Sequence, residues 1–212
     1  MGKKISVGPG CMLAPIPAVM VSLSSKGEDN IITIGWTGVL NSDPPMTYIS
    51  VRKERHSYKM LKESREFVIN LVSDDLVYAM DHCGVVSGSK EDKFEAMHLT
   101  KVPAEVVKCP MIAEAPVNIE CKVVKVEQLG SHDMFMAEIV AVHADEKLVD
   151  KNGRIAFEKA KLVSYVHGEY FGLDSKPLGT FGYSVMKKKT AAKRKAAGKP
   201  IGTKKPHWDK KK

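Results

Sequence analysis

The sequence has few cysteines, and their spacing argues against a disulfide framework and against a zinc site. Its 212 residues include four, Cys11, Cys83, Cys109 and Cys121, which lie far apart and form no Cys-x-x-Cys pair. This spacing is typical of reduced thiols in a cytoplasmic protein rather than of a disulfide framework or a zinc site. We therefore expect a cytoplasmic location and no metal site.

Long apolar runs are also absent. The longest, residues 11–23, is interrupted by Pro15 and Pro17. It falls short of the roughly 20 residues that a helix needs to span a bilayer. A Gly-Pro-Gly triplet before it breaks the apolar core that a signal peptide requires. The sequence therefore predicts no membrane partner.

The common signatures of nucleotide binding and hydrolysis are missing. There is no Gly-x-Gly-x-x-Gly after a strand, no Walker A loop, no His-Glu-x-x-His and no Gly-x-Ser-x-Gly. The seven histidines are scattered along the chain. If this protein is an enzyme, we expect its chemistry to come from a bound cofactor rather than from catalytic side chains.

Positive charge is concentrated at the end of the chain. The whole sequence has 33 Lys and Arg against 25 Asp and Glu, but residues 187–212 hold 12 of the cations and one acid. This segment has no apolar periodicity, so we predict a folded domain over residues 1–186 and a disordered Lys-rich tail over 187–212. The spaced cations suit weak, non-specific binding of a nucleic acid. A solubilising extension without a partner is the alternative.

The hydrophobic pattern predicts a mainly β protein. Val117 to Val123 alternates between apolar and polar residues, as a half-buried strand does. Strands outnumber helices, and no strand–helix alternation is present, so we expect a closed or nearly closed antiparallel barrel with short helical insertions. Apolar runs of strand length occur at residues 18–23, 31–36, 46–51, 67–71, 117–123, 134–142 and 162–166.

Three short helices are expected from capping patterns. Ser57 is placed to cap a turn that reaches Ser64. Ser73 begins a second helix, for which Gly84 is a suitable end. Ser89 has the character of a capping box and begins a third.

The first segment of functional interest ends a predicted strand. Thr33, Gly35, Trp36 and Thr37 offer a hydroxyl, backbone N–H groups and an aromatic plate, and the glycine lets a flat ligand approach the main chain. The plainer interpretation is a core tryptophan beside a turn.

The second segment lies where a strand passes into a helix. Three fixed cations, Arg52, Lys53 and Arg55, stand beside His56 and Ser57. Cations at a helix N-terminus suit a phosphate, because free N–H groups and the helix dipole add to their charge. The alternative is a solvated, charged strand end.

The third segment leads into a capped helix. Ser87 and Gly88 provide small residues, and Lys93 provides a second cation for an anionic ligand. The alternative is a surface loop with an ordinary cap. For the nearby Cys83, a buried inert thiol is the preferred interpretation over a redox role, since no second cysteine is close.

Together the three segments resemble one family. Their order and spacing, with Asp43-Pro44-Pro45 and the pattern Ser-Gly-x-x-x-Asp-Lys-Phe at residues 87–94, are similar to the flavin reductase-like FMN-binding split-barrel family and most of all to its flavoredoxin branch. The resemblance covers residues 5–184. It implies a Greek-key split β-barrel and a homodimer that binds FMN at the subunit interface. It also implies that electrons come from NAD(P)H or from a redox partner protein.

The resemblance also implies roles for individual residues. The residues expected around the flavin ring are Thr33, Gly35, Trp36 and Thr37. Those expected around its phosphate are Arg52, Lys53, Arg55, His56, Ser57, Ser87, Gly88 and Lys93. The expected function is an FMN-dependent oxidoreductase. The alternatives are a non-catalytic FMN carrier and a nucleic-acid-associated protein that acts through its tail. The electron acceptor stays open, as does the choice between NADH and NADPH.

Overall fold

The protein is described by a computed structural model that covers residues 2–173, 176–197 and 202. The chain divides into two compact units, Met1–Leu173 and Asp174–Lys212. The domain boundary that we expect after residue 186 stays a prediction. Within the described residues, no helix has the length and apolar character needed to cross a membrane.

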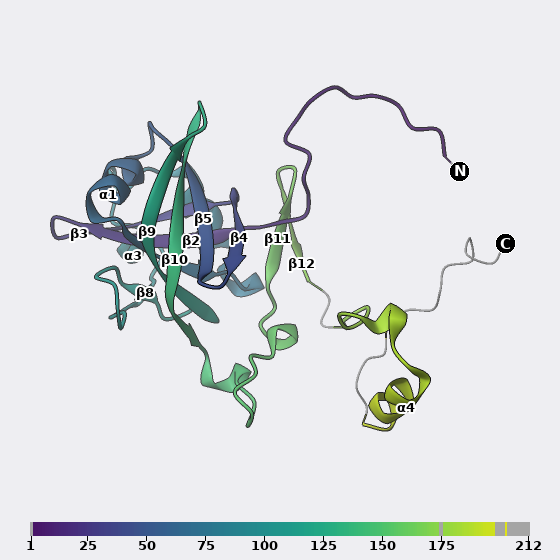
Figure 1. The fold of residues 1–212 in the computed structure, drawn as a ribbon. Coiled ribbons are helices and arrows are strands. Elements are labelled where there is room, and N and C mark those ends of the chain that lie inside the picture. Colours follow the sequence, from purple (N-terminus) through teal and green to yellow (C-terminus); the bar gives the residue numbers. More distant parts are fainter. Residues whose placement is uncertain (1, 174–175, 198–201, 203–212) are drawn as a thin grey trace. The chain divides into compact units, whose positions relative to one another are not determined.

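A seven-stranded antiparallel sheet dominates the first unit, in the order β3-β2-β6-β9-β10-β5-β4 (Figure 1). This confirms the predicted mainly β, antiparallel fold. The apolar run at residues 134–142 lies in β10, which is an inner strand between β9 and β5. The strands are β2 (Val19–Ser25), β3 (Glu28–Ile34), β4 (Thr37–Ser42), β5 (Pro45–Arg52), β6 (Glu66–Leu71), β9 (Val117–Gln128) and β10 (His132–Ala144).

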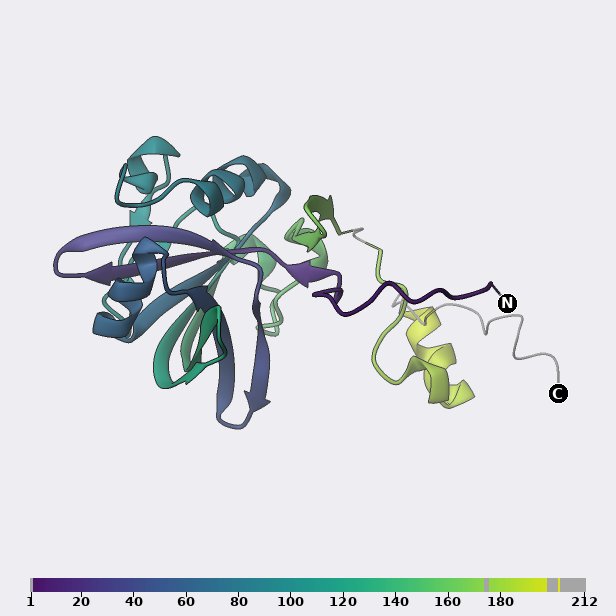
Figure 2. The same cartoon turned by 90° about the horizontal axis from the view of Figure 1, so that it is seen from above.

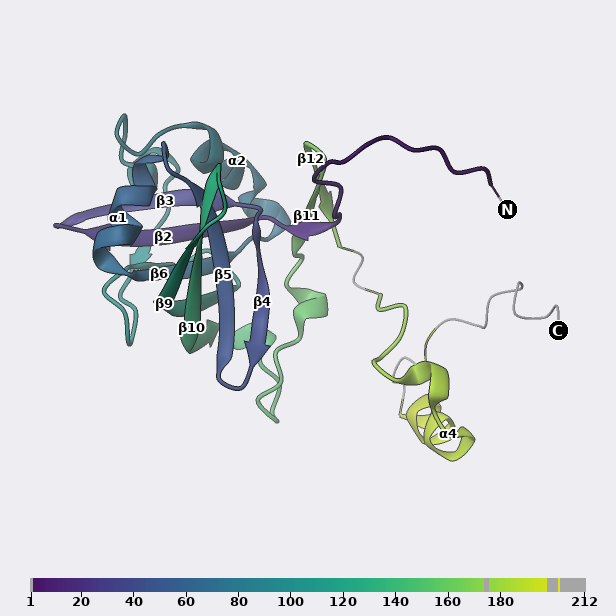
Figure 3. The ribbon, with the colours of Figure 1, turned by 45° about the horizontal axis from the view of Figure 1, so that its top comes forward.

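The sheet curls so that its first and last strands approach each other (Figure 3). The corner between β3 and β4 is the point of closure, where Ser50 of β5 donates its N–H to the carbonyl of Trp36 at 2.9 Å. The site residues at this corner are therefore held by three strands.

Two smaller sheets complete the unit. β1 (Ile16–Pro17) pairs with β11 (Val163–Val166), which forms a hairpin with β12 (Glu169–Gly172). Figure 2 shows the purple N-terminal segment passing through β1 into the main sheet, and β1 pairs antiparallel with β11. The other small sheet contains β7 (Lys101–Val102) and β8 (Met111–Ile112).

The apolar runs of the central strands are explained by two hydrophobic clusters. Along β2, Val21 and Leu23 point into the barrel interior, whereas Met20 belongs to a second cluster with Met80 and Phe94. Both faces of this strand are therefore buried, so its sequence does not alternate. The second cluster holds α2 (Val77–Val85) and α3 (Lys93–Ala96) against the outside of the sheet.

Two of the three expected helix caps are wrong, whereas Ser73 is confirmed as the cap of a short helical turn that continues directly into α2. The cap of α1 is Arg55, and Ser57 lies buried in the first turn. Asp92, not Ser89, caps α3, because its carboxylate accepts the N–H groups of Phe94 and Glu95. Gly84 lies inside α2 and does not end it. The helical elements of the first unit are α1 (His56–Ser64), η1 (Asp74–Leu76), α2 (Val77–Val85), α3 (Lys93–Ala96), η2 (Glu146–Leu148) and η3 (Phe157–Lys159).

The second unit contains η4 (Tyr183–Val185) and α4 (Lys188–Ala196). The helix differs from our expectation of an unstructured tail for these nine residues. It consists of Ala, Lys, Arg and one Thr, most of which favour helix, and none of its residues is buried. The rest of the predicted tail, residues 198–201 and 203–212, lies outside the described residues.

Candidate functional site

Two adjoining cavities bring the three predicted segments together. One has a volume of about 280 Å³ and the other about 180 Å³, and Ile32 and Arg55 belong to the walls of both. Ten of the twelve predicted residues line one or both: Thr33, Gly35, Trp36, Arg52, Arg55, His56, Ser57, Ser87, Gly88 and Lys93. A larger open depression of about 680 Å³ lies elsewhere, around Ser25 and Glu63, and contains none of them.

The larger of the adjoining cavities, hereafter the ring cavity, is built around the β3–β4 corner. Trp36 is 40% exposed there, which rules out a core tryptophan. Thr33 directs its hydroxyl to the carbonyl of Met80. Thr37 lines neither cavity, because its hydroxyl donates to the Tyr48 carbonyl within the sheet at 2.5 Å. The ring cavity thus offers an exposed indole beside open glycine backbone.

The basic residues of the β5–α1 corner take different positions. Arg55 donates a guanidinium N–H to the carbonyl of Gly84, which ties this corner to α2. Arg52 borders the ring cavity with His132, a residue that the sequence analysis missed. Burial, followed by the positive charge of Arg52, lowers the pKa of His132. His132 begins β10, and its register partner in β5 is Arg52, so only the fold brings it to the site.

Lys53 lies apart from both cavities. It is the first residue after β5, so the alternation of side chains along the strand does not extend to it. Its ammonium lies 3.4 Å from the carboxylate of Asp133, which is fully buried and also accepts a hydrogen bond from Tyr58 at 2.6 Å. The Tyr58 hydroxyl and the Lys53 ammonium hold the pKa of Asp133 below its ordinary value despite burial. Lys53 therefore anchors the corner.

The smaller cavity, hereafter the anion cavity, begins at the N-terminus of α1. The first N–H groups of a helix have no partner within it, and α1 has no acidic residue in its first turn. Its cap residue, Arg55, makes no side-chain capping bond. Positive helix-end charge and free donors therefore point toward this cavity. His56 also lines it, although its ring pairs with Glu28 at 2.7 Å.

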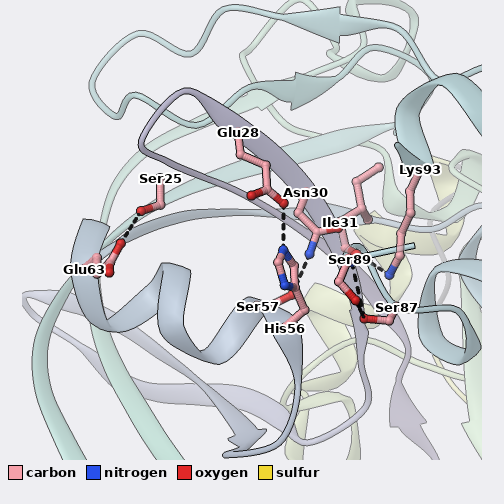
Figure 4. Close-up of polar contacts among 10 residues, drawn as sticks. All are labelled: Ser25, Glu28, Asn30, Ile31, His56, Ser57, Glu63, Ser87, Ser89 and Lys93. Atoms are coloured by element: carbon pink, nitrogen blue, oxygen red, sulfur yellow. Dashed lines mark hydrogen bonds and ion pairs between the residues drawn. The ribbon is translucent and has the colours of Figure 1, made fainter. Parts of the chain in front are cut away.

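Lys93 is the buried cation of the anion cavity (Figure 4). The residue is 3% exposed, and its ammonium donates to the carbonyls of Ile31 and Cys83, each at 2.8 Å. Burial lowers its pKa to about 8, and the charge of Arg55 contributes in the same direction. A lysine has three donors, so one N–H remains beyond these two bonds.

Gly88 allows a close approach that no other residue would permit. A Cβ atom at this position would lie 2.2 Å from Oδ1 of Asn30, which is far inside contact distance. The Asn30 amide in turn donates to the buried Ser57 hydroxyl at 2.9 Å (Figure 4). Asn30 thus joins β3, α1 and the loop after α2, although it was missed because an isolated Asn in a strand gives no signal.

Cys83 lies beside the site but is buried, and burial raises the pKa of its thiol to about 11. The preferred interpretation of an inert thiol agrees with this protonated state. Across the residues that the structure covers, no three His, Cys, Asp or Glu side chains are grouped so that they could hold a metal ion.

The geometry fits an elongated ligand with two different ends. The ring cavity offers an aromatic side chain and glycine backbone to a flat group, and the anion cavity offers Lys93, Arg55 and a helix N-terminus to an anion. Because the two cavities share a wall, one ligand can place its flat end in the ring cavity and its anionic end in the anion cavity.

A family model described as the flavin reductase like domain matches residues 12–173. The chain belongs to this family. The flavoredoxin of Desulfovibrio vulgaris (Miyazaki F) is 30% identical, with a TM-score of 0.78 over 85% of this chain and 98% of its own. The flavoredoxin of Methanosarcina acetivorans is 26% identical, with a TM-score of 0.79 over 87% of this chain and all of its own. These likenesses confirm the predicted family and its flavoredoxin branch.

A third relative belongs to an enzyme system. It is the reductase component of a 4-nitrophenol 4-monooxygenase/4-nitrocatechol 2-monooxygenase of Rhodococcus opacus, 26% identical over 125 residues, which is 59% of this chain and 64% of the relative.

Proposed function

We propose that this protein binds FMN and acts as a flavin-dependent oxidoreductase that takes electrons from NAD(P)H or from a redox partner protein. The observation that carries the proposal is the pair of adjoining cavities, one suited to a flat ring and the other to an anion. Bound FMN supplies the electron-transfer chemistry, and the chain supplies binding, orientation and electrostatics.

The anion cavity suits the FMN phosphate for three independent reasons. Lys93 offers a charge-assisted hydrogen bond, the N-terminus of α1 offers backbone donors, and Ser57 stands buried beside them. Gly88 keeps this side of the cavity free of a Cβ atom. Each feature favours an anion, and together they favour FMN over riboflavin.

The ring cavity suits the isoalloxazine. Trp36 presents partly exposed indole surface, and Gly35 leaves its backbone open to a flat group. Arg52 stands in the same wall and offers positive charge to the electron-rich edge of the ring. No side chain is needed as an acid or a base in this scheme.

Anaerobic mixing with NADH and with NADPH tests the enzymatic part of the proposal. A reductase bleaches the absorbance of bound flavin within the mixing experiment. The alternative function, a non-catalytic FMN carrier, predicts that the absorbance persists with both nucleotides and falls only with a chemical reductant such as dithionite.

A homodimer with the flavin at its interface forms part of the proposal. The edge strand β4 exposes Val39 at 82%, and Val142 of β10 is 51% exposed. Apolar side chains on a sheet edge and a long hairpin suit a second copy of the chain. Size-exclusion chromatography with light scattering tests this, and dilution below the dimer dissociation constant should release flavin.

Nucleic-acid binding through the tail is a second candidate function. Helix α4 has cations in both its first and last turns and no buried residue. Lys189 and Lys193, one turn apart, repel each other, and a polyanion relieves this repulsion. Salt-dependent binding of single-stranded RNA by the full chain but not by residues 1–186 is the expected result.

We also propose that the protein works in a reducing compartment such as the cytoplasm. Cys83, Cys109 and Cys121 are buried as free thiols. Thiol-trapping of these cysteines in unfolded protein taken directly from cells measures their redox state.

A further inference from the structure

A third cavity, hereafter the acceptor cavity, shares Trp36 with the ring cavity. Its volume is about 210 Å³. Three distant parts of the chain form it: the segment before β1, the β3–β4 corner and the β11–β12 hairpin. The lining residues are Cys11, Leu13, Ala14, Ile16, Trp36, Tyr165 and His167.

Backbone pairing holds the walls of this cavity in place. Ile16 of β1 is the register partner of Tyr165 in β11. The Tyr165 ring packs against that of Tyr170, with centroids 5.8 Å apart, and the Tyr170 hydroxyl donates to Asp81 at 2.6 Å. His167 stands at the turn of the hairpin with a left-handed φ of 47°.

The chemistry of the lining differs from that of the other two cavities. Those contain Arg52, Arg55 and Lys93, whereas the acceptor cavity has no Lys, Arg, Asp or Glu in its wall. A charged ligand would find no ionic partner in this wall. The aromatic and aliphatic side chains favour a flat, uncharged molecule.

The volume of the acceptor cavity and its hydrogen-bond donors restrict the class of ligand further. Drug-sized ligands occupy cavities of roughly 300–1,000 Å³, so this smaller space suits one or two rings. The imidazole of His167 and the thiol of Cys11 can each donate a hydrogen bond to a carbonyl oxygen. A small quinone combines all of these properties.

We propose that the acceptor cavity binds a small uncharged quinone, which is the electron acceptor of this protein. The proposal rests on the proposed flavin-dependent function, because the shared Trp36 puts the quinone next to the ring cavity. In the net reaction the C4–H bond of the dihydronicotinamide breaks and the donor is oxidised to NAD(P)⁺. The two electrons, the hydrogen and one solvent proton form two O–H bonds on the quinone, which is reduced to the hydroquinone.

The test fills the cavity and compares binding and turnover with a matched variant. Leu13 is 85% exposed, so Leu13→Trp adds bulk at the cavity without disturbing the core. Val7→Trp is the control, since Val7 is 75% exposed in the same segment but outside the lining. The probe is duroquinone, whose ring carbons are all substituted and which therefore reacts poorly with thiols. Calorimetry on the oxidised protein measures its binding, and KM is measured for duroquinone and for ferricyanide.

The expected result is that Leu13→Trp weakens duroquinone binding about tenfold or more and raises its KM, with Val7→Trp equal to wild type. The KM for ferricyanide, which is anionic, should be the same in Leu13→Trp and in wild type. Equal duroquinone binding by wild type and Leu13→Trp, an equal loss in Val7→Trp, or no binding by wild type would overturn the proposal. Failure of the proposed function is distinguishable, because it appears as absent flavin or absent NAD(P)H oxidation while quinone binding persists.

Discussion

Replacing Lys93 with methionine removes the one buried cation that faces the anion cavity. Lys93 is 3% exposed, and its ammonium donates to the Ile31 and Cys83 carbonyls. A charge-assisted hydrogen bond contributes about 1.5–3 kcal/mol. Lys93→Met should therefore weaken FMN binding roughly 10- to 150-fold.

Riboflavin and a neighbouring lysine provide the controls. Riboflavin lacks the phosphate, so its affinity should be the same in Lys93→Met and in wild type. Lys90→Met changes an exposed lysine three positions earlier and should leave FMN binding unaltered. The assay is a titration of flavin-free protein followed by flavin fluorescence, with circular dichroism to confirm that each variant is folded. FMN affinity within twofold of wild type, or an equal loss for riboflavin, would refute the reasoning.

The pKa of Lys93 adds a pH dependence whose sign is fixed. Burial lowers that pKa from 10.5 to about 8, so in the folded protein the cation is present below pH 8 and lost above it. FMN affinity should therefore fall as the pH rises through 8, and riboflavin affinity should not. Between pH 8 and 10.5 the unfolded chain holds more protons at this residue, so the contribution of Lys93 to the free energy of unfolding rises. Both pH dependences, that of FMN affinity and that of the free energy of unfolding, should be present in wild type and absent in Lys93→Met.

Three further changes test other parts of the site. Trp36→Ala should weaken FMN and riboflavin binding alike, because it removes ring contacts; an effect on FMN alone would contradict this. Gly88→Ala should lower the melting temperature and the FMN affinity, because the added Cβ would lie 2.2 Å from Asn30; an unchanged variant would disprove the close approach. Deletion of residues 187–212 changes the formal charge from +8 to −3 and should abolish RNA binding at low salt without loss of flavin; flavin release would contradict separate roles for the domain and the tail.

Local patterns predicted most strands of the main sheet well. The alternation in residues 117–123 depends only on which face of a strand is buried, and β9 contains this stretch. In contrast, β4 was missed. It is an edge strand whose apolar residues Val39 and Leu40 are exposed, so its sequence has no alternating pattern set by burial against the core. Its pairing with β5 decides that it is a strand.

The positions of charged side chains were harder to predict. Lys53 and Lys93 have the same residue type and lie near the same corner of the fold, but Asp133 pairs with the first and the anion cavity contains the second. Asp133 is 80 residues away from Lys53 in the sequence, so no local pattern connects them. Asn30 and His132 were missed for the same reason, since each reaches the site through pairing with a distant strand or helix.

One helix cap, Ser73, was predicted correctly, and two were predicted at the wrong residues. Ser89 and Asp92 are both residue types that favour caps, and the cap is Asp92, whose carboxylate accepts two backbone N–H groups. Ser57 lies two residues after the actual cap of α1, Arg55, and its hydroxyl accepts a hydrogen bond from the Asn30 amide instead of capping the helix.

The absorption spectrum of the purified protein, followed by acid release of the bound chromophore, tests the central claim most directly. The account predicts the spectrum of oxidised flavin, one flavin per chain, and a released compound that is FMN and not FAD or riboflavin. If the protein contains no flavin and does not take up FMN on incubation, or if it retains FAD in preference, the assignment of Lys93 and the N-terminus of α1 to a phosphate of FMN is wrong.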